Sequence, residues 1–184
     1  MSGPGDSHAP DPDSLTDLQL LYNGRPWFNN HPGVSGDPFL FTREYLNGTV
    51  YIGGKAFEAL KLKVDLLTDG LLTPFGSEGL LRLNKERIDS FSFTYAQQPY
   101  HFVRIPGDST ALLDGYAELL YRGRSILYRK YAKIIDRPGT ENTGDRYVTI
   151  TRTYLVHNAQ TVLIKGRRDL FRAFGDVKKP LQES

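Results

Sequence analysis

The chain has 184 residues, of which 39% are hydrophobic and 12% aromatic, enough for one domain with a packed core. Its formal net charge is +2, but residues 1–17 carry four Asp and no Lys or Arg, which leaves about +6 on the rest. The absence of Cys excludes disulfides, thiolate metal sites and a Cys nucleophile, and no apolar run approaches the roughly 20 residues of a membrane helix.

The first segment, "MSGPGDSHAPDPDS", lacks the basic and apolar regions of a signal peptide. We expect residues 1–17 to form a flexible leader. It would be either natural or the remainder after a signal sequence was replaced.

The next stretch, "YNGRPWFNNHPGVSGDPFLF" (residues 22–41), combines five aromatic residues with three Pro. Pro denies a backbone donor, so no long strand can run through this stretch, yet its aromatic side chains are too apolar to stay in water. We expect an irregular loop packed across a sheet, and the alternative is a ligand-contact loop. Trp27, His31 and Asp37 are therefore candidate ligand-binding residues.

Over much of the chain the hydrophobic period is close to two, which indicates half-buried strands. In "LKLKVDLL" (residues 60–67) the apolar residues share one face, and Lys61, Lys63 and Asp65 share the other. The segments "FSFTY" (residues 91–95) and "YVTITRTYLV" (residues 147–156) alternate in the same way. Turn signals at hairpin spacing separate the runs at residues 53–54, 69–70, 122–123 and 157–160.

Short connections favour antiparallel neighbours. The sequence therefore predicts an all-β domain over residues 18–165, an antiparallel meander forming a sandwich or partly open barrel. "LNKERIDSF" (residues 83–91) fits either a strand interrupted by a turn or one helical turn. "DRPGTENTGDR" (residues 136–146) predicts a mobile surface loop. Residues 166–184 have helical spacing and predict a short C-terminal helix and tail.

Four segments carry a resemblance: "YNGRPW…GDPFLF", "GTVYIGGKAFEALKLKVDLLTDGLL", "GYAELLYRGRSILYRK" and "TYLVHNAQTVLIKGRRDLFRAFGDVKK". Across roughly residues 20–179 the chain resembles a family of uncharacterised, exported, β-rich bacterial envelope proteins with no established activity. The resemblance implies a periplasmic or cell-envelope location. It supplies no catalytic residue.

Catalytic and metal motifs are weak. "GTVYIGGKAF" lacks the spacing and the Ser or Thr of a phosphate-binding P-loop, so a Gly-Gly hairpin turn is the preferred interpretation. None of the four His has the i, i+4 spacing of a helical zinc site, and His157 falls at a turn where its ring would meet water. His31 alone has unusual neighbours, with a metal or acid–base role as the alternative to a structural one. We predict no cofactor, no metal site and no catalytic residue.

The segment "YRGRSILYRKYAKIIDR" (residues 121–137) interleaves Tyr with Arg and Lys, as in sites for single-stranded nucleic acid, anionic glycans or lipid headgroups. Strand alternation places Arg129 and Tyr131 on one face and Tyr128 and Lys130 on the other. The cations therefore point to both faces and form no single stripe. We keep Tyr128, Arg129 and Tyr131 as candidate ligand contacts. Protection of a sheet edge is the preferred interpretation, and nucleic-acid binding is not expected.

These observations favour a non-enzymatic envelope protein that binds a partner protein or an envelope component. One alternative is a carrier of a small apolar ligand or lipid in a cavity inside the sheet. Another is a hydrolase with a site around His31. The oligomeric state, the ligand and the source stay open.

Overall fold

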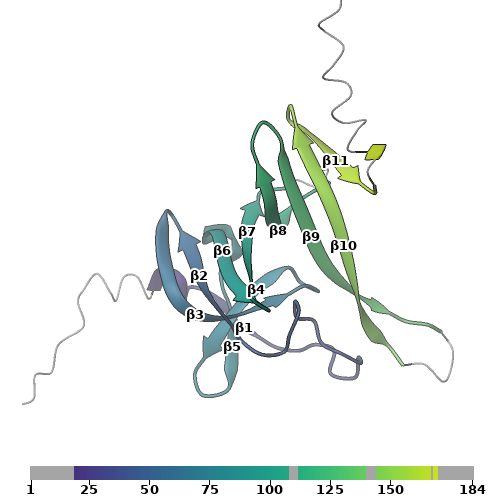
Figure 1. Cartoon of the computed structure of the whole chain (residues 1–184). Helices are drawn as coiled ribbons and strands as arrows, with labels where there is room; N and C mark the ends of the chain where they lie inside the picture. The colour runs from purple at the N-terminus through teal and green to yellow at the C-terminus, as the bar shows by residue number, and fades with distance from the viewer. Residues whose placement is uncertain (1–18, 108–111, 140–143, 167, 170–184) are drawn as a thin grey trace, which may run out of the picture.

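A computed structural model describes residues 19–107, 112–139, 144–166 and 168–169. They form one antiparallel sheet of eleven strands in the order β1-β5-β4-β3-β2-β6-β7-β8-β9-β10-β11 (Figure 1). The elements are β1 (Arg25–Trp27), β2 (Leu46–Ile52), β3 (Lys55–Asp65), β4 (Gly70–Phe75), β5 (Gly79–Arg82), the 3₁₀ helix η1 (Lys85–Arg87), β6 (Ile88–Tyr95), β7 (Gln98–Ile105), β8 (Gly115–Arg122), β9 (Ile126–Asp136), β10 (Arg146–His157) and β11 (Gln160–Ile164).

The predicted all-β, antiparallel class is confirmed, and the sheet is not closed. All four predicted turns join antiparallel neighbours. The β10–β11 turn places Asn158 and Ala159 at φ +47° and +60°, the conformation that two-residue hairpins require. The β6–β7 turn adopts the same region at Ala96 and Gln97, and neither residue type signals such a turn in a sequence. In residues 83–91, for which the sequence allowed either a strand with a turn or one helical turn, η1 forms one helical turn and β6 follows it directly.

The main core lies on the inner face of the curled sheet. Phe91 stacks on Phe102 with ring centroids 5.0 Å apart, and Tyr116 meets Phe91 edge-on at 5.0 Å. All three side chains are at most 2% exposed. A second apolar cluster, which includes Tyr128 and Tyr154, is separate from the first. Strand alternation places Tyr128 on the face opposite to Arg129 and Tyr131, as predicted.

One predicted strand face is partly wrong. Leu62 and Val64 of β3 are buried as expected, but Asp65, expected on the outward face with Lys61 and Lys63, is only 1% exposed. Trp27 of β1 covers Asp65 and donates its indole N–H to the carboxylate at 2.8 Å. The error arises because β3 ends at Asp65, where a distant aromatic residue replaces solvent.

A buried carboxylate shapes the turn that follows β3, here called the 65–70 turn. The Asp65 carboxylate accepts the backbone N–H groups of Leu67 and Thr68 at 2.9 and 3.2 Å and the Thr68 hydroxyl at 2.5 Å. Arg82 of β5 lies 3.7 Å from the same carboxylate. A buried charge is tolerated only when its oxygens are paired in this way, so these contacts determine the course of the turn.

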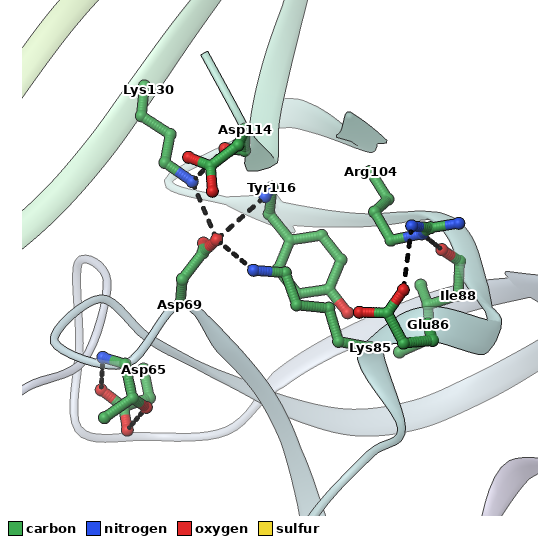
Figure 2. Close-up of polar contacts among 10 residues, drawn as sticks. Asp65, Asp69, Lys85, Glu86, Ile88, Arg104, Asp114, Tyr116 and Lys130 are labelled. Atoms are coloured by element: carbon green, nitrogen blue, oxygen red, sulfur yellow. Dashed lines mark hydrogen bonds and ion pairs between the residues drawn. The ribbon is translucent and has the colours of Figure 1, made fainter. Parts of the chain in front are cut away.

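Through Asp69, the same turn links the β3–β4 connection to strands β8 and β9 (Figure 2). One Asp69 oxygen accepts Lys85 at 2.6 Å, Lys130 of β9 at 2.9 Å and the backbone N–H of Tyr116 of β8 at 3.2 Å. The Lys130 ammonium also donates to the Asp114 carbonyl oxygen at 2.8 Å. A carboxylate between two ammonium groups is a charge-assisted link, so the 65–70 turn is attached to both β8 and β9.

Residues 28–45, here called the entry loop, form backbone contacts with both β3 and β10. Leu40 N–H donates to the Val64 carbonyl and Leu66 N–H to the Pro38 carbonyl, at 2.9 and 2.8 Å. Farther along, Ser35 forms an isolated bridge with Arg146 at the start of β10. The loop is irregular and packed, as predicted for residues 22–41, although Trp27 belongs to the short strand β1.

Some predictions fall outside the described residues. The leader (residues 1–17) lies there entirely, and so does most of the predicted C-terminal helix, of which only residues 166, 168 and 169 are described. The predicted surface loop at residues 136–146 is described except for residues 140–143. These expectations remain predictions.

We predict that Gly115→Ala destabilises the fold. Gly115 has φ +71°, and an added Cβ would collide with the Asp69 carboxylate and lie within 2.9 Å of the Lys85 and Lys130 ammonium groups. We expect a loss of about 1–3 kcal/mol, or about 2–10 °C in Tm, measured by thermal melting. Gly33→Ala is the matched control, because its Cβ would meet nothing within 4 Å. Equal Tm changes in the two variants would contradict the role assigned to the Asp69 link.

Candidate binding site

A surface hollow of about 340 Å³ lies where the entry loop and the 65–70 turn meet β9 and β10. We call it the Phe41 hollow. Its lining combines apolar, aromatic and hydroxyl side chains with one ion pair, a mixture typical of ligand sites. The lining residues are Asp37, Phe39, Leu40, Phe41, Leu66, Tyr131, Lys133, Thr149 and Thr151.

Phe41 stands in a strained conformation beside the hollow. Its φ is +62°, and Thr42 N–H donates to the Leu40 carbonyl at 2.7 Å across it, which is γ-turn geometry of the rare positive-φ type. This conformation costs a bulky residue about 1–3 kcal/mol. The hydrogen bond from Leu40 N–H to Val64 holds the chain on one side of the turn. Strain of this kind is concentrated at functional sites, so the conformation of Phe41 supports this hollow as a candidate binding site.

An aromatic cluster surrounds Phe41. Its ring stacks on Tyr95 with centroids 4.9 Å apart and 12° between the planes, and it meets Tyr100 and Tyr131 at 4.8 and 5.7 Å. Phe41 as a residue nevertheless remains 37% exposed. The strained turn therefore presents an aromatic ring to solvent beside the hollow.

A tyrosine–carboxylate pair forms the polar side of this cluster. The Tyr131 hydroxyl donates to Glu118 at 2.8 Å, and Arg129 lies 3.6 Å from the same Glu118 oxygen. Burial, together with the hydrogen bond to Glu118, raises the pKa of Tyr131 to about 12. Tyr131 is therefore a neutral hydrogen-bond donor at physiological pH, already engaged with an internal acceptor.

Lys133 holds the entry loop against β9. Its ammonium donates to the carbonyls of Phe39 and Asp37 at 2.7 and 2.8 Å and lies 3.4 Å from the Asp37 carboxylate. Lys133 backbone N–H also donates to the Leu66 carbonyl at 3.0 Å. An ammonium has three donors. Because all three are directed at the loop, Lys133 positions the wall of the hollow.

Asp37 is stabilised in its ionised form. Burial alone would raise the pKa of Asp37, but hydrogen bonds from Arg43 and the Phe39 N–H, together with the nearby Lys133 ammonium, lower it below its usual value. The Arg43 contact is 3.0 Å and the Phe39 contact 2.8 Å. Asp37 therefore acts as the anionic partner that fixes this end of the entry loop.

The structure separates the predicted site residues into three places. Asp37 and Tyr131 line the Phe41 hollow, and Arg129 contacts Tyr131 beside it. Trp27 and His31 line a different cavity of about 30 Å³ with Pro38, Asp65 and Tyr147, room for about one or two waters. His31 and Asp37 thus do not share a cavity. Tyr128 is 8% exposed and packs in the second apolar cluster.

Sequence reasoning missed several side chains of this region. Tyr95, Tyr100, Thr149 and Thr151 carry only ordinary strand patterning. Glu118 offered a usable signal, because in "YAELLY" an acidic residue occupies the alternation position of Tyr116, which is in the core. Glu118 is 7% exposed and its internal partners explain why it is tolerated there.

The ring of His157, expected to meet water at a turn, contacts a buried side chain instead. Its Nδ1 atom lies 2.7 Å from the Ser125 hydroxyl oxygen, so the ring is engaged with the protein. Ser125 is 5% exposed and lies in the β8–β9 turn, whereas His157 ends β10. The contact joins the ends of two neighbouring hairpins.

Comparisons of the chain with protein-family models, with curated proteins and with solved structures return no match. Across the described residues, no three His, Cys, Asp or Glu side chains are grouped so that they could hold a metal ion. No helix in the same residues has the length and apolar character needed to cross a membrane.

We predict that Asp37→Asn lowers stability in a pH-dependent manner. A carboxylate whose folded pKa is lowered adds stability above its unfolded pKa of about 3.9, and this contribution disappears as the pH falls through the folded value. The Tm difference between wild type and Asp37→Asn should therefore be largest above about pH 5 and shrink below about pH 4. Thermal melts from pH 7 to pH 2.5 at constant ionic strength measure it.

Glu44→Gln is a suitable control, because Glu44 is an exposed residue of the same loop. A Tm difference for Asp37→Asn that grew as the pH fell would contradict the role assigned to this carboxylate.

Proposed function

We propose that this protein is a non-enzymatic binding protein of the bacterial cell envelope, and that the Phe41 hollow holds its partner protein or envelope component. The observation that carries the proposal is Phe41, which is 37% exposed, at φ +62°, beside a hollow of about 340 Å³. Exposed aromatic rings on a rigid frame contribute strongly to binding, since little conformational entropy is lost on contact. The envelope location is inferred from the resemblance of the chain to exported proteins.

The chemistry of the hollow supports binding more than turnover. Lys133 and Asp37 are paired with each other and with the backbone, and Tyr131 is engaged with Glu118. A catalytic nucleophile and its base would need to face the substrate without being occupied by hydrogen bonds to the protein itself. Thr149 and Thr151 add hydroxyl groups to the lining, which suits a polar ligand with an apolar face.

The alternative functions receive less support. A carrier needs an enclosed apolar cavity, whereas Phe91, Phe102 and Leu62 fill the inner side of the curled sheet. A hydrolase around His31 needs a second group, and Asp37 lines a different cavity. Asp65 shares the cavity of His31, but its carboxylate already accepts hydrogen bonds from Trp27, Leu67 and Thr68.

We predict that Phe41→Ala weakens binding to the envelope ligand about tenfold or more, equivalent to about 1.4 kcal/mol, because the exposed ring is removed. The test immobilises wild type, Phe41→Ala and Phe28→Ala, exposes them to solubilised bacterial envelope extract, and quantifies each retained species. Any retained species is then purified, and its Kd is measured by biolayer interferometry.

Phe28→Ala is the matched control, because Phe28 is 73% exposed but does not line the hollow. A defined species should be retained by wild type and Phe28→Ala and lost by Phe41→Ala, with all three proteins melting cooperatively. Equal retention by all three proteins would overturn the assignment of the Phe41 hollow. Uptake of an apolar dye into the wild-type protein, released by a lipid, would favour the carrier instead.

A further inference from the structure

A second hollow, of about 390 Å³, lies between β1, β5 and η1. It shares no lining residue with the Phe41 hollow. Three of its lining side chains are cationic, Arg25, Arg82 and Lys85, and one, Glu86, is acidic. We call it the Arg25 hollow.

Two of these cations lie opposite each other on neighbouring strands. Arg25 of β1 and Arg82 of β5 are cross-strand partners in an antiparallel pair, so their side chains leave the same face of the sheet. Like charges in this position destabilise a sheet unless something between them is negative. Arg25 is exposed and forms no ion pair among the described residues. The register thus places two guanidinium groups together without a shared internal anion.

Arg82 is only partly satisfied by the protein. Its Nη2 donates to the Thr68 hydroxyl at 3.0 Å and lies 3.7 Å from Asp65, a carboxylate that already accepts several shorter hydrogen bonds. Its Nε atom is buried and has no hydrogen-bond partner among the residues that the structure describes. The buried Nε cannot reach a ligand, but the Arg82 side chain is 41% exposed, so the rest of its guanidinium group is open to solvent.

Lys85 adds a third positive charge. Its ammonium contacts Asp69, but that single carboxylate also neutralises Lys130, so the group of three carries a net positive charge. Glu86, the acidic residue of the lining, is 80% exposed and pairs with Arg104 at 3.4 Å (Figure 2). The charge around the hollow is therefore positive.

Neutral donors complete the lining. Asn84 Oδ1 accepts the Glu86 backbone N–H at 3.1 Å, which leaves the Asn84 amide NH₂ group free to donate. The chain at Gly24 passes so close to β5 that an added Cβ would collide with the Arg82 carbonyl. Residues 23–25 and residues 82–86 therefore place cationic and amide donors around one open space.

We propose that the Arg25 hollow binds a phosphate group. A phosphate monoester carries about −1.5 to −2 charges at pH 7 and has several acceptor oxygens. Two guanidinium groups and an ammonium match this charge, and planar guanidinium groups form paired hydrogen bonds with phosphate oxygens. The phosphate is either a free ion or a group carried by a larger molecule.

The test measures binding to the 184-residue protein by isothermal titration calorimetry in low-salt buffer. The ligands are inorganic phosphate, glycerol 3-phosphate, acetate and vesicles containing phosphatidic acid. The wild type is compared with Arg25→Gln, which removes the cation that has no ion pair among the described residues. Arg152→Gln on β10 is the matched control, because Arg152 is also exposed and forms no ion pair in the same part of the chain.

Arg25→Gln should raise the Kd for phosphate about tenfold or more, and Arg152→Gln should change it less than about twofold. Binding of inorganic phosphate and glycerol 3-phosphate assigns a free ion or soluble ester, and binding of vesicles alone assigns a phosphate on a lipid. Acetate binding as tightly as phosphate, an equal loss in both variants, or no binding of any phosphate ligand would overturn the proposal. Phe41→Ala should bind phosphate normally, so the two sites can fail independently.

Discussion

Two carboxylates in the 65–70 turn hold the curled sheet in shape. Asp65 is almost completely buried, and its oxygens accept hydrogen bonds from the turn itself and from Trp27 on β1. Asp69 binds Lys85, Lys130 and the Tyr116 backbone. Because a buried or half-buried carboxylate is costly without such partners, contacts from β1, β8 and β9 all stabilise the turn.

This constraint also determines the Phe41 hollow. The Leu66 carbonyl of the turn accepts the Lys133 backbone N–H, and the Lys133 ammonium binds the entry loop. The loop is thus held between β3 and β9 immediately before Phe41, the residue with φ +62°. The energy of the surrounding contacts offsets the local strain, which is how such conformations persist in folded proteins.

The two lysines of β9, Lys130 and Lys133, contact other parts of the protein and do not form a binding surface. Lys130 binds the Asp69 carboxylate and the Asp114 carbonyl. Lys133 binds the Asp37 carboxylate and the carbonyls of Asp37 and Phe39. A run of Lys, Arg and Tyr in a sequence resembles a polyanion site, but here Lys130 and Lys133 both bind carboxylate and carbonyl oxygens of the protein itself. The cations around the Arg25 hollow differ, because their register brings like charges together while part of the guanidinium surface is open to solvent.

The sequence by itself determined the strands and most of the turns, since period-two alternation and local turn chemistry act over a few neighbouring residues. It also placed Arg129 and Tyr131 on one face and Tyr128 on the other. Only the tertiary structure decided that Asp65 is buried, that His31 and Asp37 lie in different cavities, and that Phe41 is held at positive φ. Each of these depends on contacts between residues far apart in the chain, and alternation carries no information about which distant segment will cover a given position.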